Sequence, residues 1–145
     1  MKKTLLFLSF ALLFSACSSH DTSNNPSVQA LNGKPALIVL AATFCPHCQD
    51  EADFLETEIY PLYKEDAHIL INVLDNASGK QKFDVEVPQI FDRKLFYQEL
   101  TGESCNLIPS WVLLKSNGDL YDYECGNTKG AEKIIKGLEK LLPRI

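Results

Sequence analysis

The chain has 145 residues, of which 46% are hydrophobic, and a formal net charge of −5 at neutral pH. This length is sufficient for one domain with a buried core and too short for two. An acidic chain is poorly suited to nucleic acid or to an anionic lipid surface, so neither is expected as the main partner.

The first sixteen residues have the pattern of a secretory signal peptide. Lys2 and Lys3 form a positively charged start, and an apolar run from Thr4 to Ala16 follows them. This run is too short to span comfortably the ~30 Å hydrocarbon core of a bilayer, so cleavage is favoured over a retained anchor helix. We therefore expect residues 1–16 to be removed.

Cys17 directly follows the small residues Ser15 and Ala16. This arrangement resembles a bacterial lipobox, in which the cysteine becomes the lipidated first residue of the mature chain. The resemblance implies a lipid anchor on Cys17 and a place in the bacterial cell envelope, facing the periplasm. The alternative is ordinary cleavage nearby, which would leave a secreted periplasmic protein with Cys17 as a free thiol.

The polar composition of residues 17–32 favours a flexible tether, so the folded domain is predicted to cover residues 33–145. Export also permits disulfide chemistry. Without Cys17 four cysteines remain, and they allow three pairings: Cys45, Cys48, Cys105 and Cys125.

The first half of the domain predicts two buried strands with a helix between them. Continuous apolar runs, Ala36 to Phe44 and His68 to Leu74, are typical of strands covered on both faces. Pro46 suits the first turn of the intervening helix, and Pro61 is expected to kink or end it. Apolar residues at three- and four-residue spacing mark its buried face: Ala52, Leu55, Ile59 and Leu62.

The second half predicts an insertion, a short helix, a hairpin and a last helix. Residues 75–91 are interpreted as an inserted excursion with a short strand at 83–87, and residues 92–100 as a helix capped by Gly102. Asn117-Gly118 is a strong tight-turn signal between strands 111–115 and 120–125. Thr128 can cap the last helix, and Pro143 ends it. This order predicts an α/β fold with a mixed central sheet and helices on both faces.

The segment Cys45-Pro46-His47-Cys48 lies where the first strand meets the helix. Free N–H groups and the positive end of the helix dipole favour a thiolate at Cys45, so its pKa is expected to be lowered. His47 in the same turn is expected to add a donor or a partial positive charge. Cys48 can then resolve a mixed disulfide by attacking Cys45.

Other uses of a CxxC motif fit less well. Attachment of c-type haem requires histidine directly after the second cysteine, where Gln49 stands. A structural zinc site usually has a second close cysteine pair, but Cys105 and Cys125 are twenty residues apart. A structural Cys45–Cys48 bridge would close a very small loop and add little stability.

Ile108-Pro109 precedes the hairpin directly, where a proline marks a turn or the start of a strand. If this bond were cis, Pro109 could pack beside the CxxC motif and leave backbone groups free for an extended substrate segment. Base rates alone favour the trans form.

The segments "GKPALIVLAATFCPHC", "LIPSWVLLKSNGDL" and "ECG" together resemble the thioredoxin superfamily over residues 33–142. The resemblance implies a thioredoxin-like fold, a thiol:disulfide oxidoreductase activity without cofactor or metal, and a cis bond at Pro109. Pro46-His47 matches the DsbA type, an oxidant, whereas Ile108 before the proline resembles thioredoxin, a reductant. The redox direction therefore stays open.

The resemblance also implies partners. Small tethered relatives often reduce partner proteins, for example apocytochromes, and a membrane redox partner would recharge them. The chain itself is expected to act as a monomer on exported cysteine-containing proteins. In the superfamily the regions of Cys105 and Cys125 lie beside the active-site rim, so a second disulfide between them is plausible. It would either brace the proline loop or exchange with Cys45–Cys48.

One position departs from the superfamily pattern. The buried acidic residue six positions before the first motif cysteine is replaced by Val39. The proton acceptor for Cys48 is therefore missing or supplied by another residue, for which Glu51 is a candidate.

Two further functions stay open. One is a copper or zinc chaperone that binds metal through Cys45 and Cys48, with His68 as the available histidine. The other is a tethered binding module whose CxxC motif is inert.

Overall fold

The computed structural model describes residues 20, 22, 24–126 and 130–142. The predicted signal peptide, Cys17 and the Thr128 cap lie outside the described residues. Within them, no helix is long and apolar enough to cross a membrane.

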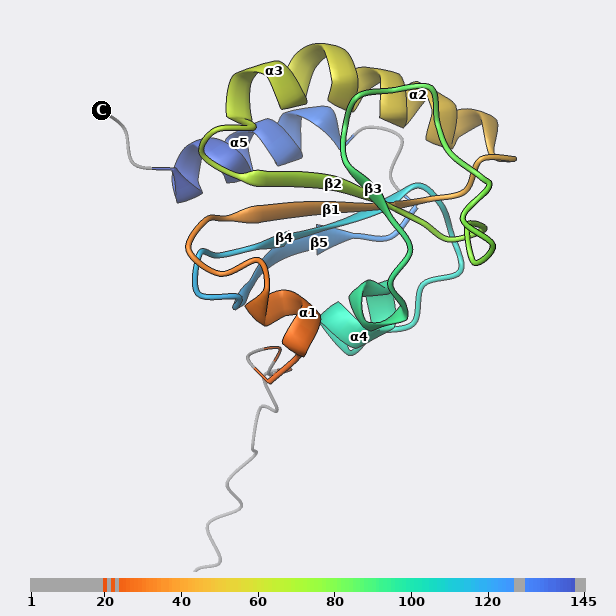
Figure 1. Ribbon diagram of the computed structural model, residues 1–145. Helices are drawn as coiled ribbons and strands as arrows, with labels where there is room; N and C mark the ends of the chain where they lie inside the picture. The colour runs from red at the N-terminus through yellow and green to blue at the C-terminus, as the bar shows by residue number, and fades with distance from the viewer. Residues whose placement is uncertain (1–19, 21, 23, 127–129, 143–145) are drawn as a thin grey trace, which may run out of the picture.

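Five strands form one sheet in the order β3-β2-β1-β4-β5 (Figure 1). β1 pairs in parallel with β2, and β2 with β3, whereas β4 is antiparallel to both β1 and β5. This mixed arrangement confirms the predicted sheet, with the hairpin as its antiparallel side. The strands are Ala36–Ala41 (β1), His68–Val73 (β2), Gln89–Ile90 (β3), Ser110–Leu114 (β4) and Leu120–Glu124 (β5).

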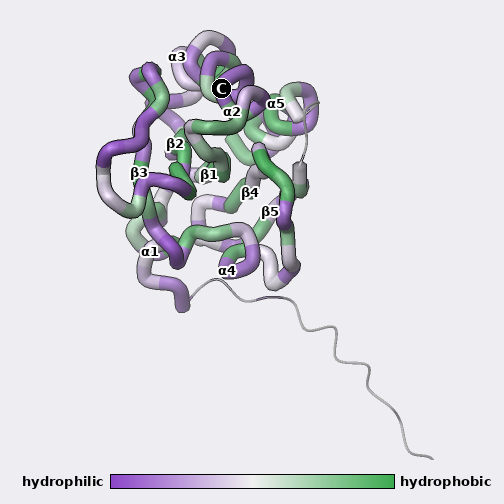
Figure 2. The backbone as a smooth tube through the Cα atoms, turned by 90° about the vertical axis from the view of Figure 1, so that its right-hand side faces the viewer, coloured by the Kyte–Doolittle hydropathy of each residue, from purple (hydrophilic) through white to green (hydrophobic). Residues whose placement is uncertain are grey.

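Helices cover both faces of the sheet, as predicted (Figures 1 and 2). On one face lie α2 (Pro46–Phe54), a π-helical turn (Leu55–Ile59), α3 (Tyr60–Tyr63) and α5 (Ala131–Leu141). On the other lie α1 (Pro26–Gln29), a 3-10 turn (Arg93–Leu95) and α4 (Tyr97–Thr101), which Gly102 caps at a φ of 76°.

The strand β1 is buried on both faces because its alternate side chains enter two separate apolar clusters. Leu37, Val39 and Ala41 pack with the α2 and α5 side, together with Trp111. Ile38 and Leu40 pack with the α1 and α4 side. This explains the unbroken apolar run in the sequence.

The helix does not end at Pro61. A π-helical turn precedes α3, and Pro61 lies in the first turn of α3. A π turn shifts the backbone hydrogen-bond register, and a proline in the first turn of a helix needs no N–H partner. The chain therefore continues as one irregular helical segment to Tyr63.

The inserted segment differs from its prediction. Residues 83–87 form no strand, and the short strand of this region is β3 at Gln89–Ile90. Side chains form hydrogen bonds with the backbone of this segment instead. Gln89 accepts from the Phe83 N–H at 2.8 Å and donates to its carbonyl, and Glu56 accepts from the N–H groups of Glu86 and Val87. Figure 1 shows this segment rising from the sheet edge to α2.

The last part of the predicted tether is folded onto the domain, which corrects the expected boundary at residue 33. Asn25 caps α1, and Val28 is 1% exposed in the cluster of the α4 side. The Thr22 hydroxyl donates to the Gly118 carbonyl at 2.7 Å. A short polar sequence with one well-placed valine can therefore add to a core, although its composition suggests a linker.

Candidate active site

The CxxC motif forms the predicted junction between β1 and α2. Cys45 is the N-cap residue of α2, and Pro46 lies in the first turn. The Cys48 N–H donates to the Cys45 sulfur at 3.3 Å. Both cysteines are free thiols, but Cys45 is partly exposed whereas Cys48 is fully buried. An incoming sulfur can therefore reach Cys45 first.

The Pro109 loop lies against the motif. The Ile108-Pro109 bond is cis, as the resemblance implied, and the Cys45 sulfur lies 3.9 Å from the Ile108 carbonyl oxygen. Two segments 63 residues apart in sequence thus meet at the reactive sulfur.

The His47 ring points to solvent. Its side chain is 69% exposed, and its Nδ1 lies 3.8 Å from an oxygen of the Asp50 carboxylate. A protonated ring is therefore partly neutralised by Asp50, and solvent screens the pair. Both effects weaken any influence of the His47 charge on Cys45, so its tuning role stays a prediction.

Asp75 was not identified from the sequence, and it holds the loop before the motif. Its carboxylate accepts from the Thr43 N–H at 3.1 and 3.2 Å and from the Thr43 hydroxyl at 2.6 Å. Asp75 follows β2, and β2 is parallel to β1. Since parallel neighbours end at the same edge of a sheet, a carboxylate directly after the second strand was the signal that could have revealed this contact.

Glu51 provides a buried carboxylate near Cys48. It is 9% exposed, and burial raises its pKa to about 7. Among the described residues, its Oε1 atom has no hydrogen-bond partner. Glu51 follows Cys48 by three positions on α2, which places both on one face of the helix.

The Cys48 thiol is held in its protonated form. Burial, the hydrogen bond with Cys45 and the negative charges of Cys45 and Glu51 raise its pKa to about 12. Val39 lies on β1 in the same apolar cluster as Cys48. The carboxylate near Cys48 is therefore that of Glu51 on α2, and the β1 position where the superfamily has an acidic residue is occupied by Val39.

Cys105 and Cys125 are joined by a disulfide, with a Cα–Cα distance of 5.7 Å. It joins the loop before Pro109 to the end of β5. The Leu107 side chain also packs on Gly126, where an added Cβ would lie 2.5 Å from Leu107. The disulfide and this contact connect the Pro109 loop to the end of β5.

His68 is not placed to share a metal with the motif cysteines. It pairs with Ala36 at the start of β1, whereas Cys45 follows the far end of that strand. A six-residue strand is about 20 Å long. In the described part of the chain, no group of three His, Cys, Asp or Glu residues could hold a metal ion.

These features define a thioredoxin-like fold with a CxxC site at the N-terminus of α2. No protein-family model and no curated protein sequence matches the chain. Solved structures with the same fold do match it. A protein from Chlorobium tepidum, provisionally named thiol:disulfide interchange protein DsbE, has a TM-score of 0.65 at 18% identity, with 80% of this chain and 85% of that chain covered.

Two further structures agree. MTB DsbF, solved in mixed oxidised and reduced forms, has a TM-score of 0.59 at 21% identity, with 78% of this chain and 84% of that chain covered. StoA from Bacillus subtilis has a TM-score of 0.51 at 19% identity, with 73% and 83% covered. At these identities the likeness establishes the fold.

Proposed function

We propose that the chain is a thiol–disulfide oxidoreductase that exchanges disulfides with cysteine-containing proteins through Cys45 and Cys48. The observation that carries this proposal is the unequal placement of the two thiols. Cys45 is partly exposed at a helix N-terminus, and Cys48 is buried behind it on the same face as Glu51. The similar structures named as interchange proteins support the same reaction.

In the reducing direction, the Cys45 thiolate attacks one sulfur of a substrate disulfide. A Cys45–substrate disulfide forms, and the other substrate sulfur leaves as a thiolate. The Cys48 sulfur then attacks Cys45, and the substrate leaves as its second thiolate. Two electrons have passed to the substrate, and Cys45–Cys48 is oxidised. The oxidising direction is the reverse.

Glu51 supplies the base for the second step. A thiol with a pKa of about 12 is almost entirely protonated at neutral pH, so Cys48 must lose its proton as it attacks. A carboxyl with a pKa of about 7 is about half ionised there and can accept that proton. We therefore assign Glu51 the role of proton acceptor for Cys48, which the apolar side chain of Val39 cannot perform.

The test is trapping of the intermediate. A Cys48→Ser variant keeps the attacking sulfur and lacks the resolving one, so it should accumulate proteins joined to Cys45 by a reducible bond. The matched control, Cys45→Ser with Cys48→Ser, should trap none. If the single variant traps no more protein than the double variant, the proposed function is wrong.

The location is part of the same proposal. Residues 1–17 support export and lipid anchoring at Cys17, on the periplasm-facing side of a bacterial membrane. Exported cysteine-containing proteins would then be the substrates, and a membrane redox partner would recharge the motif. Mass spectrometry of the mature N-terminus should find an acylated Cys17; an unmodified N-terminus at another residue would contradict the anchor.

A further inference from the structure

The chain before β1 is bound to the α4 side of the domain at two points. The His20 Nε2 atom lies 2.8 Å from the Glu99 carbonyl oxygen, and the ring lies against Gly102, where an added Cβ would be 3.0 Å from its Nδ1 atom. Thr22 is 3% exposed, and its hydroxyl donates to the Gly118 carbonyl. The chain therefore contacts both the end of α4 and the turn between β4 and β5.

The same stretch of chain is held again at α1. The Asn25 side-chain amide donates to the Lys94 carbonyl at 2.7 Å, and the Ser27 hydroxyl donates to the Asp92 carboxylate at 2.6 Å. Together these contacts define a docked segment, residues 20–28, whose described residues are held on one side of the sheet. This part of the predicted tether is thus a fixed part of the domain.

Docking leaves little free chain between the domain and the proposed lipid anchor. Ser18 and Ser19 are the residues that separate Cys17 from His20. Three residue steps span at most about 10 Å when fully extended, whereas a free tether from Cys17 to residue 33 would span up to about 50 Å. An anchored domain is therefore confined close to the bilayer, with its docked side nearest to it.

The charges of the two faces differ in a way that favours the same orientation. The helical segment 46–63 on the opposite face carries five carboxyl side chains and no Lys or Arg: Asp50, Glu51, Asp53, Glu56 and Glu58. The capped 3-10 turn, α4 and the β4–β5 turn carry three basic and three acidic side chains: Arg93, Lys94, Lys115, Asp92, Glu99 and Asp119.

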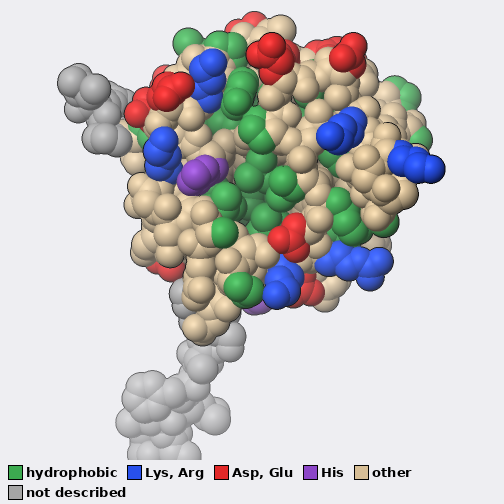
Figure 3. Space-filling model, in the orientation of Figure 1, with side chains coloured by type: hydrophobic (Ala, Val, Ile, Leu, Met, Phe, Trp, Pro, Cys, Tyr) green, Lys and Arg blue, Asp and Glu red, His purple; other side chains and the backbone are tan. Residues whose placement is uncertain are grey.

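Figure 3 shows acidic side chains along the top of the molecule, over α2 and α3, and acidic and basic side chains together at the bottom. An anionic lipid surface acts on exposed charges within a Debye length, ~8 Å at physiological ionic strength. Such a surface repels the α2 face, whereas the balanced charges of the α4 face let it approach.

We propose that the domain meets the membrane with the face formed by α1, the 3-10 turn, α4 and the β4–β5 turn, and that the docked segment sets this orientation. Figure 1 shows α1 and α4 together on one side of the sheet and α2, α3 and α5 on the other. The partner of this face is a lipid surface. The proposal rests on the proposed acylation of Cys17.

This orientation limits the redox partner of Cys45. Cys45 is the N-cap of α2 and packs against the apolar cluster of that side, whereas the docked segment lies on the α4 side. The reactive sulfur is thus held on the side of the domain away from the bilayer. A protein that recharges it must present its cysteines on a domain that projects from the membrane, and not within the headgroup layer.

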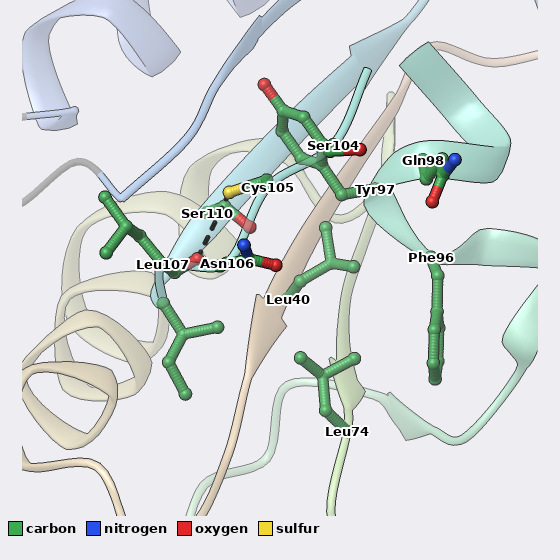
Figure 4. Close-up of a pocket in the computed structure, with 11 residues that line it drawn as sticks. Leu40, Leu74, Phe96, Tyr97, Gln98, Ser104, Cys105, Asn106, Leu107 and Ser110 are labelled. Atoms are coloured by element: carbon green, nitrogen blue, oxygen red, sulfur yellow. Dashed lines mark hydrogen bonds between the residues drawn. The ribbon is translucent and has the colours of Figure 1, made fainter. Parts of the chain in front are cut away.

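The docked segment leaves the Pro109 loop accessible. A cavity of about 210 Å³ beside this loop lies on the same sheet face, and Figure 4 shows it between Phe96 and Leu107. No described residue of the docked segment lines this cavity. The segment therefore attaches the domain without covering the approach to the loop.

The experiment measures which face lies close to lipid. The full chain, expressed with its leader, is purified from the membrane fraction and reconstituted in vesicles of phosphatidylethanolamine and phosphatidylglycerol. Cys45 and Cys48 are replaced by serine, and a fluorescent dye is attached to one introduced cysteine. Ser116→Cys places the dye on the β4–β5 turn, and Thr57→Cys, a second exposed hydroxyl position, places it on the α2 face.

A nitroxide attached to the lipid headgroup quenches the dye at short range. We expect the dye at Ser116→Cys to lose most of its fluorescence and the dye at Thr57→Cys to keep it. The control inserts about 20 Gly and Ser residues after Ser19, which adds about 25 Å of flexible reach. The loss at position 116 should then fall to that at position 57.

Equal quenching at the two positions, stronger quenching at position 57, or a difference that survives the insertion would overturn the orientation. Flotation of the vesicles separates these results from failure of the anchor. If the protein floats with the vesicles but shows no difference, the orientation alone is wrong. If it does not float, the anchor and the orientation fail together, and trapping by the Cys48→Ser variant still decides the exchange function by itself.

Discussion

Cys48 and Glu51 are buried one helical turn apart on α2, and burial keeps both of them protonated to higher pH than in water. A buried carboxyl without a hydrogen-bond partner destabilises the fold when it is ionised. Its presence beside a thiol that must lose a proton is the central feature of the site.

Replacement of Glu51 by glutamine should slow resolution of the mixed disulfide. The glutamine side chain has a similar shape and cannot accept the Cys48 proton. We expect a loss of at least about 100-fold near neutral pH, within the range typical of a positioned base. The parent rate should rise with pH up to about 7 as Glu51 ionises, and the variant should lack this step. Stopped-flow measurement of the rate at which Cys48 resolves the mixed disulfide, as a function of pH, checks this. A variant with the same pH profile as the parent would contradict the role of Glu51.

The same substitution should stabilise the protein at alkaline pH. The pKa of Glu51 is raised from 4.5 to about 7 on folding, so the folded state binds more protons than the unfolded state between these values. Stability is therefore lost as pH rises through this window, by up to about 3 kcal/mol. Glu51→Gln should have the higher free energy of unfolding at about pH 8, and the difference should shrink below about pH 5. Denaturant unfolding at both pH values checks this; a destabilised variant at pH 8 would contradict it.

Much of this site could be predicted from the sequence because its parts are local. A strand that runs directly into Pro46 places Cys45 at a helix N-terminus, and Asn117-Gly118 sets the hairpin by turn chemistry alone. The cis bond at Pro109 was indicated by the resemblance alone, since base rates favoured the trans form.

The remainder depends on contacts between distant segments. No local pattern indicates that Glu56 and Gln89 satisfy the inserted backbone, and so a strand was expected at 83–87 where none forms. The burial of Val28 likewise depends on the core that it meets. Glu51 could be named as a candidate from its position, but its burial required the packed structure.

The Asp75 carboxylate should be needed to hold the motif loop. Asp75→Ala removes acceptors of the Thr43 N–H and hydroxyl, so it should lower the free energy of unfolding by about 1–3 kcal/mol and slow exchange at Cys45. Thr43→Val removes the hydroxyl alone and should cost less. Unfolding curves and alkylation rates of the two variants test this, and equal losses would show that the backbone contact contributes nothing.

Removal of the Cys105–Cys125 disulfide should cost stability. A sequence separation of 20 residues predicts a loss of about 3 kcal/mol when both cysteines are replaced by serine. As a brace, the bond should stay oxidised while Cys45–Cys48 is titrated with glutathione. Mass spectrometry of alkylated samples checks this; reduction of the two pairs together would instead indicate exchange between them.

The reduction potential of the Cys45–Cys48 pair tests the account most directly. We expect reversible equilibration with a thiol–disulfide buffer, at a potential between about −120 mV, as in strong oxidants, and about −270 mV, as in reductants. The value within this range would also give the redox direction. A pair that forms no reversible disulfide, or one with a potential below about −300 mV as in structural disulfides, would contradict a role in disulfide exchange.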